Sequence, residues 1–223
     1  HAYGDLVVYR GLDFEAERGQ RTVLVGPNGA GKSTILKVAN GQVVPTRGCV
    51  HIAGHHVNGS RPAAIAAAGV CSIPEGRGVF PNLTVEENLE LMTYRGVTRA
   101  DVTDRTYAQF PRLQERRRQL AGTMSGGEQQ MLAMARALCT DPRLLLLDEI
   151  SMGLGPMIVA ELYELVGQLA ETGIAVLLVE QFVRTALAVA DMAVVLSGGS
   201  VVQMGKPAEV LDAVTHAYLG GAA

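Results

Sequence analysis

A glycine-rich loop near the amino terminus has the residue spacing that binds phosphate groups. The residues GPNGAGKST fit the pattern G-x-x-x-x-G-K-[ST], and they lie between an apolar strand-like run and a helix-like run, as such a loop requires. Glycines let backbone N–H groups wrap around phosphates, Lys32 offers a positive charge to the β- and γ-phosphates, and the Ser33 hydroxyl offers a ligand to Mg²⁺. A glycine-rich turn matched by chance is the alternative, and the flanking elements argue against it. The sequence therefore predicts a nucleoside triphosphate site formed by Gly26, Pro27, Asn28, Gly29, Ala30, Gly31, Lys32, Ser33 and Thr34.

Two adjacent carboxylates, Asp148 and Glu149, follow a run of four leucines. A metal ion held by phosphates needs an acidic partner, and a water molecule that attacks the γ-phosphate needs a group that orients it or accepts its proton. Asp148 suits the first role and Glu149 the second. A strand end that faces solvent is the simpler interpretation of one acid. A pair of acids in a chain with a phosphate-binding loop favours hydrolysis of the nucleotide.

The segment MSGGEQQMLAMARAL, residues 124–138, predicts a helix with an unusual start. Ser125 and Glu128 fit a capping box, but glycines occupy the first turn, where each costs about 1 kcal/mol relative to alanine. The free N–H groups of a helix start attract anions, and glycine lets a phosphate touch the backbone. The two anion sites could share one nucleotide within a chain, or two chains could each lend a helix start to the other's nucleotide. The predicted contacts are Ser125, Gly126, Gly127 and Glu128.

These residues need a scaffold, and the apolar pattern predicts α/β architecture. Short apolar runs bounded by charge or glycine predict buried strands, and the helical segments between them are long enough to cross back over a sheet of mainly parallel strands. With the phosphate-binding loop, this scaffold predicts a P-loop NTPase core. Strands are expected at residues 21–26, 143–149, 174–181 and 192–199.

Two segments depart from this alternation. Glycine-bounded β-type runs in residues 46–60 predict a small antiparallel β-subdomain. A polar, helical pattern that begins near Val79, with a capping box from Thr84 to Glu87, predicts an inserted helical subdomain. We therefore expect a nucleotide-binding core with the antiparallel β-subdomain in residues 1–78, a helical subdomain that ends in the glycine-headed helix in residues 79–140, and the remaining core with the acidic pair in residues 141–223.

The composition argues against several classes of protein. A net charge of −3 over 223 residues disfavours a protein that binds nucleic acid by neutralising phosphates. The three cysteines lack C-x-x-C spacing, which argues against a disulfide framework or a zinc site and indicates a reducing cytosol. His51, His55 and His56 are interpreted as part of a surface hairpin rather than a metal site. No apolar run approaches the roughly 18 residues of a membrane span, so a role at a membrane must come through a partner.

In order along the chain, GPNGAGKST, MSGGEQQMLAMARAL and LLLLDE resemble the Walker A, signature and Walker B motifs of ATP-binding cassette (ABC) proteins. The resemblance runs from Tyr3 to about residue 211. In that family two cassettes form a head-to-tail dimer, with ATP held between the Walker A loop of one chain and the signature of the other. Closure of the dimer drives transport, and hydrolysis reopens it. The resemblance implies that Tyr3 stacks on the adenine, that Glu149 is the catalytic carboxylate, and that Ser125 meets the γ-phosphate in trans.

Two further stretches, IPEGRGVFPNLTVEENL and LLVEQF, are similar to one cassette type of the branched-chain amino acid importers, a class that includes urea and short-chain amide systems. The resemblance implies an ATPase with ATP and Mg²⁺ as cofactors, peripheral to the cytoplasmic face of the membrane. Its implied partners are a second cassette of the same or a paralogous chain, transmembrane permease subunits and, indirectly, a solute-binding protein, but no nucleic acid. Phe80 and Pro81 lie where the family receives a short permease helix, and local packing is the equal alternative.

Three positions depart from the common cassette pattern. Glu75 stands where many cassettes carry glutamine, and its carboxylate could coordinate Mg²⁺ or the attacking water and relay closure to the permease. Gln181 stands where many carry the switch histidine. An amide can donate a hydrogen bond to the γ-phosphate but cannot shuttle a proton, which favours Glu149 as the base. Gly155 replaces an aspartate after Walker B, so communication between the two sites is expected to differ. Family members usually have a strand of about eight residues before the adenine-stacking tyrosine, so an incomplete antiparallel edge is also expected.

Two other functions are alternatives to transport. A soluble ABC ATPase that acts as a switch in translation or DNA maintenance is the main alternative. Those classes carry two cassettes, or a long coiled coil between Walker A and signature, and the 91 residues between Ser33 and Ser125 hold neither. A P-loop kinase or GTPase would need a lid over a substrate phosphate or a guanine-reading N-K-x-D sequence, and we find neither in the chain.

Overall fold

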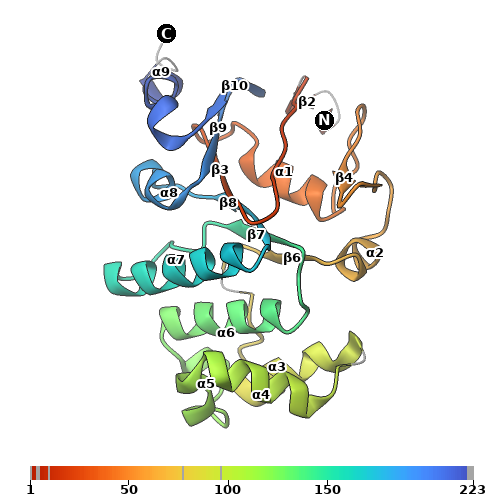
Figure 1. The fold of residues 1–223 in the computed structure, drawn as a ribbon, viewed down its shortest axis with the longest axis vertical. Helices are drawn as coiled ribbons and strands as arrows, with labels where there is room; N and C mark the ends of the chain where they lie inside the picture. The colour runs from red at the N-terminus through yellow and green to blue at the C-terminus, as the bar shows by residue number, and fades with distance from the viewer. Residues whose placement is uncertain (1, 4–5, 10, 77, 96, 220–223) are drawn as a thin grey trace.

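A sheet of mainly parallel strands lies at the centre of the molecule (Figure 1). The computed structural model describes residues 2–3, 6–9, 11–76, 78–95 and 97–219. Within them the strand order is β10-β9-β3-β8-β7-β6, and every neighbouring pair is parallel except β10 with β9. This arrangement confirms the predicted α/β class. The strands are β3 (Arg21–Val25), β6 (Val70–Ile73), β7 (Leu144–Asp148), β8 (Ala175–Val179), β9 (Met192–Ser197) and β10 (Ser200–Gly205).

Both faces of the sheet are covered, as a parallel sheet requires. Successive side chains of a strand point to opposite faces, so Leu145 and Leu147 of β7 belong to one hydrophobic cluster and Leu146 to another, all fully buried. The helices that contribute residues to the first cluster include α6 (Gly126–Leu138), α7 (Pro156–Glu171), α8 (Val183–Val189) and α9 (Leu211–Leu219). The second includes residues of α1 (Lys32–Ala39) and α2 (Pro62–Ala67).

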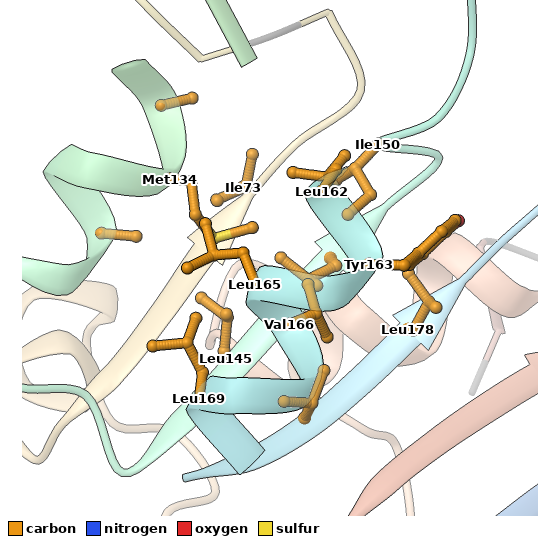
Figure 2. Packing of buried hydrophobic residues seen from close by; sticks show 14 of the residues in the cluster. Ile73, Met134, Leu145, Ile150, Leu162, Tyr163, Leu165, Val166, Leu169 and Leu178 are labelled. Atoms are coloured by element: carbon orange, nitrogen blue, oxygen red, sulfur yellow. The ribbon is translucent and has the colours of Figure 1, made fainter. Parts of the chain in front are cut away.

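Helix α7 illustrates how the sequence pattern produces this packing. Leu162, Val166 and Leu169 recur at intervals of four and three, which places them on one face of the helix. Figure 2 shows them gathered in one cluster with Leu145 of β7 and Leu178 of β8. Their burial packs α7 against β7 and β8, the two strands whose ends lie at the acidic pair.

The helices between β6 and β7 gather at the end of the molecule farthest from β10 and α9 (Figure 1). The capping box predicted from Thr84 to Glu87 is present, with the Thr84 N–H donating to Glu87 Oε2 at 2.7 Å. Pro111 divides the long polar run into two helices, since proline lacks an N–H group and suits a helix start. The elements are α3 (Val85–Glu90), α4 (Arg99–Gln109), α5 (Pro111–Glu115) and α6, with the short 3-10 helices η1 (Leu91–Arg95) and η2 (Ala121–Thr123).

Two short antiparallel pairs complete the β-structure of the described residues. Strands β4 (His51–Ile52) and β5 (His55–His56) form the predicted antiparallel excursion. Strands β1 (Ala2–Tyr3) and β2 (Leu6–Val7) form the other pair. A last short 3-10 helix, η3 (Pro207–Glu209), precedes α9. None of the described helices combines the length and the apolar content that a membrane crossing needs.

Candidate functional site: a phosphate-binding loop beside an acidic cleft

The parallel strands bring the predicted motifs to one edge of the sheet. Val179 of β8 is paired in register with Leu24 of β3 and with Asp148 of β7, and Ile73 of β6 is paired with Leu147. These strands therefore reach their carboxyl ends together, which is where ligands bind in open α/β sheets. The segments that leave them carry Gly26, Glu75, Glu149 and Gln181.

The phosphate-binding loop has two positions that exclude any side chain. A Cβ atom at Gly26 would lie 2.3 Å from the carbonyl oxygen of Leu196, and one at Gly31 would lie 2.4 Å from Tyr9 Cε1. Gly31 has a φ of 94° and is the N-cap of α1, and no side chain in the described part of the chain caps this helix. The first N–H groups of α1 are thus left for a ligand, and a helix start of this kind favours an anion.

The Lys32 side chain is buried against the loop. Its ammonium donates to the carbonyl oxygens of Gly26 at 2.7 Å and Pro27 at 3.1 Å. Burial lowers the pKa of Lys32, and the nearby Glu149 and Asp148 carboxylates oppose that shift. The loop carbonyls thus hold the ammonium within the loop, and it must leave them to reach a bound phosphate.

Ser33 and Asp148 meet although they are far apart in the sequence. Ser33, in the first turn of α1, donates its hydroxyl to Asp148 Oδ1 at 3.1 Å. Burial is the largest cause that raises the pKa of Asp148, and the Ser33 hydrogen bond opposes it. A hydroxyl and a carboxylate are hard oxygen donors, and Mg²⁺ is commonly bound by one or two protein oxygens together with phosphates and water. The pair fits a magnesium ion that would accompany a bound nucleotide.

An open cleft of about 270 Å³ joins the acidic edge to the glycine-headed helix. Its lining includes Glu149 after β7, Glu75 after β6 and Gln130 of α6, which is almost fully buried and whose amide nitrogen has no hydrogen-bond partner among the described residues. The structure thus brings two of the predicted catalytic carboxylates, Glu75 and Glu149, to one cleft. It also adds a residue of α6 that the sequence pattern did not single out.

The surroundings of Glu149 make it harder to ionise than an ordinary glutamate. Burial is the largest cause that raises the pKa of Glu149. The negative charges of Glu75, Asp148 and Glu180 add to this shift, and the Lys32 ammonium opposes it. A carboxylate with a raised pKa is a stronger base once it is ionised, as a proton acceptor needs to be.

Gln181 is exposed and stands two residues after the end of β8. The residue before it, Glu180, is only 1% exposed. Tyr3 lies in β1, and its side chain falls outside the described residues, so the predicted adenine contact stays a prediction.

Helix α6 starts as predicted, with Ser125 as its N-cap. The Ser125 N–H donates to Glu128 Oε2 at 2.9 Å, and the Glu128 N–H donates back to Ser125 Oγ at 3.4 Å. Glu128 also forms an ion pair with Arg116, at 3.0 Å. Ser125 is exposed, and within the described residues no hydrogen bond or ion pair joins the 125–128 segment to the loop at 26–34.

Packing explains one of the two glycines in this helix start. A Cβ atom at Gly127 would lie 2.6 Å from Ile158 Cγ2 of α7 and 3.1 Å from Cγ1. The sequence suggested that a phosphate approaches here. The structure shows that the neighbouring helix α7 already approaches Gly127 closely.

The sequence pattern missed a residue that holds the phosphate-binding loop. Tyr218 of α9 donates its hydroxyl to the Gly26 carbonyl oxygen at 2.7 Å, and the Gly26 N–H donates to the same hydroxyl at 3.2 Å. Tyr218 lies 192 residues further along the chain and belongs to no motif. A local pattern gave no signal for it.

Comparison with known proteins supports this geometry. A family model described as ABC transporter matches residues 9–151. The chain is 42% identical to the high-affinity branched-chain amino acid transport ATP-binding protein BraG of Pseudomonas aeruginosa, over 98% of this chain and 96% of that protein. It is 37% identical to the probable branched-chain amino acid transport ATP-binding protein LivF of Archaeoglobus fulgidus, over 94% and 90%. A solved ATP-binding subunit of an ABC transporter superposes with a TM-score of 0.83 at 28% identity, over 96% of this chain and 90% of that one.

The matched segment includes the loop at residues 26–34, helix α6 and the acidic pair. It spans more than half of the chain, and the relatives extend the likeness over nearly all of it. The chain therefore belongs to the ABC transporter family: it is the ATP-binding, ATP-hydrolysing subunit of a transporter, a kind of subunit that works with a second cassette and with membrane permease components.

Proposed function

We propose that this cassette powers the import of branched-chain amino acids or similar small polar or apolar solutes. The observation that supports this solute class is the 42% identity, over nearly the full length, with a protein named for high-affinity branched-chain amino acid transport. A second relative is named for the same solutes. The match to a family described as ABC transporter disfavours the alternative of a soluble ABC switch.

In the proposed mechanism, residues 26–34 bind the phosphates of ATP. The Lys32 ammonium leaves the carbonyl oxygens of Gly26 and Pro27, which hold it at 2.7 and 3.1 Å, and turns to the phosphates. Ser33 and Asp148, with Glu75 as a further oxygen donor, would hold Mg²⁺, which neutralises charge on the phosphates.

Glu149 accepts the proton of the attacking water. Glu149 lines the cleft, and its raised pKa gives its carboxylate the basicity for this role. Gln181 donates a hydrogen bond to the γ-phosphate but takes no part in proton transfer, because an amide does not titrate. Glu75 lies in the same cleft and orients the water or the metal.

Two cassettes, of like or paralogous chains, bind ATP between them in a head-to-tail dimer. The loop at 26–34 of one chain then faces Ser125, Gly126, Gly127 and Glu128 of the other, and the exposure of Ser125 supports this arrangement. The dimer binds permease subunits at the cytoplasmic face of the membrane, and through them it serves a solute-binding protein. Phe80, 48% exposed, is the proposed contact with the permease.

An uptake assay tests the solute class. Cells of the source organism that lack this chain should lose high-affinity leucine uptake, and the wild-type chain should restore it. Lys32→Ala, which removes the phosphate-binding charge, should not restore it at equal protein level. Unchanged leucine uptake, or loss of urea or amide uptake in its place, would contradict the proposed solute.

A further inference from the structure

A carboxylate with no place in the mechanism above is buried behind the acidic cleft. Glu180 is only 1% exposed and directly follows β8. Both of its oxygens accept hydrogen bonds: Oε1 from the Ser151 N–H at 3.1 Å and the Tyr163 hydroxyl at 2.5 Å, and Oε2 from the Ser151 hydroxyl at 2.7 Å. Figure 2 shows the Tyr163 side chain extending from α7 beside Leu178 of β8.

A buried glutamate costs stability unless hydrogen bonds satisfy its oxygens. Here both oxygens accept hydrogen bonds, and these bonds hold the carboxylate in one orientation. Burial and the neighbouring Glu180 raise the pKa of Tyr163 far above its ordinary value, so its hydroxyl stays a proton donor. The Ser151 N–H is a backbone donor and keeps its role at every pH. The network therefore connects α7, the end of β8 and the segment after β7 by hydrogen bonds.

That segment carries Glu149 in an unusual backbone conformation. Glu149 has a φ of 49°, a left-handed conformation that is unfavourable for a residue with a side chain and persists only where the surroundings impose it. Two contacts impose it here from the end of β8. The Glu149 N–H donates to the Val179 carbonyl oxygen at 2.9 Å, and Ser151 is held by Glu180 through two hydrogen bonds.

Glu180 is thus connected to two residues of the proposed reaction. It is hydrogen-bonded to Ser151, which lies two residues after Glu149, and it is directly followed in the chain by Gln181. Glu180 does not line the cleft itself, whereas Glu149, Ile150 and Met152 do. Any shift of its carboxylate would move the turn that presents Glu149 and the strand end that presents Gln181 together.

We propose that Glu180 is a positioning residue: held by Tyr163, it fixes the turn from Glu149 to Met152 against the end of β8 and so keeps Glu149 and Gln181 in register for ATP hydrolysis. This inference rests on the proposed role of Glu149. The turn is closed by the Met152 N–H, which donates to the Glu149 carbonyl oxygen at 3.2 Å. Positioning of this kind is costly to lose, because a misplacement of about 1 Å can reduce a rate about a hundredfold.

The test compares Glu180→Gln and Tyr163→Phe with the wild-type chain in Mg²⁺-ATPase assays. Both should lower kcat by about tenfold to a hundredfold. The KM for ATP and the binding of a fluorescent ATP analogue should stay within about twofold of wild type, because the loop at 26–34 is untouched. Glu164→Gln makes the same chemical change on the exposed side of α7 and should leave kcat unchanged.

The pH profile separates the charge of Glu180 from its positioning role. The charges around Glu149 are Glu75, Asp148 and Glu180, all of which raise its pKa, and Lys32, which lowers it. Glu180→Gln removes one of the negative charges, so the acid limb of the kcat profile should move to lower pH. Tyr163→Phe keeps the Glu180 charge, so it should lower kcat without moving the acid limb of the profile to lower pH.

Unchanged kcat in both variants, or a fall in kcat matched by an equal loss of ATP binding, would overturn the proposal. If Glu180→Gln does not fold, Ser151→Ala removes only the 2.7 Å bond to Oε2, and it should lower kcat with ATP binding intact. The proposed role of Glu149 as the base has a separate test: it would be wrong if Glu149→Gln still hydrolysed ATP.

Discussion

At the scale of single residues, Glu149 is the group on which the proposed hydrolysis depends. Its carboxylate lines the cleft with Glu75, and glutamine would keep its size but could not accept a proton. We expect Glu149→Gln to bind ATP as the wild type does, to lose at least about a hundredfold in kcat, and to accumulate an ATP-bound dimer. Equilibrium nucleotide binding, steady-state hydrolysis and size-exclusion chromatography with ATP measure these effects. Undiminished hydrolysis would remove Glu149 from the role of base.

The charge of Glu75 should set the pH range of the reaction. Glu149 must be ionised to accept a proton, so hydrolysis falls as the pH drops through its pKa. Burial first and the Glu75 charge second raise that pKa. Glu75→Gln removes the charge, so the pKa of Glu149 falls and the acid limb of the kcat profile moves to lower pH. The profile should be recorded from about pH 5 to pH 8, where raised carboxyl pKa values are resolved. A shift to higher pH, or none, would contradict this account.

At the scale of elements, the contact between α6 and α7 gives Gly127 a packing role. A methyl group there would overlap Ile158, and overpacking of this kind costs about 1–3 kcal/mol. We expect Gly127→Ala to lower the free energy of unfolding by that amount in denaturant titrations. Ile158→Ala in the same chain should recover part of the loss, which a double-mutant cycle measures as coupling. If the stability of the double variant equals the sum of the single losses, the two side chains do not conflict and the packing role is wrong.

Much of the element level was predictable, and the exceptions have physical causes. The runs RTVLV and LLLLD are apolar enough to predict buried strands, and both are strands. Strand β6 (VCSI) is short and mixed in polarity, and β10 forms the exposed edge, so neither run gives a clear signal. The glycine pattern at the start of α6 is the same whether a phosphate or Ile158 approaches it. Contacts such as Tyr218 with Gly26 depend on packing between distant segments, which no local spacing reveals.

The candidate site divides in the same way. Motif spacing predicted that Ser33 and Asp148 serve one metal, and the structure brings them within 3.1 Å. No local pattern predicts the hydrogen-bond network at Glu180, because its three donors come from Ser151 and Tyr163, 29 and 17 residues away. Buried polar networks of this kind follow from the packing of α7 on the sheet. They become visible only when the helix is in place.

At the scale of the whole molecule, the exposed start of α6 raises the question of which chain completes a nucleotide site. In a head-to-tail dimer, each site combines Lys32 of one chain with Ser125 of the other. Lys32→Ala and Ser125→Arg should each be inactive alone, since every site in either dimer carries one defect. In a mixed dimer, one site has both wild-type residues and the other has both replacements. An equal mixture should therefore recover about a quarter of the wild-type sites, if chains pair at random.

The mixture should be measured as Mg²⁺-ATPase rate per chain, with circular dichroism to show that both variants are folded. The rate per chain of the wild type should also rise with protein concentration, because dimers form by mass action. A mixture as inactive as its components would place Lys32 and Ser125 in the same site of one chain. In that case α6 would have to reach the loop at 26–34 within its own chain, across a gap that no contact bridges among the described residues. Recovery in the mixture would instead explain why Ser125 is exposed: its partner is the nucleotide of another cassette.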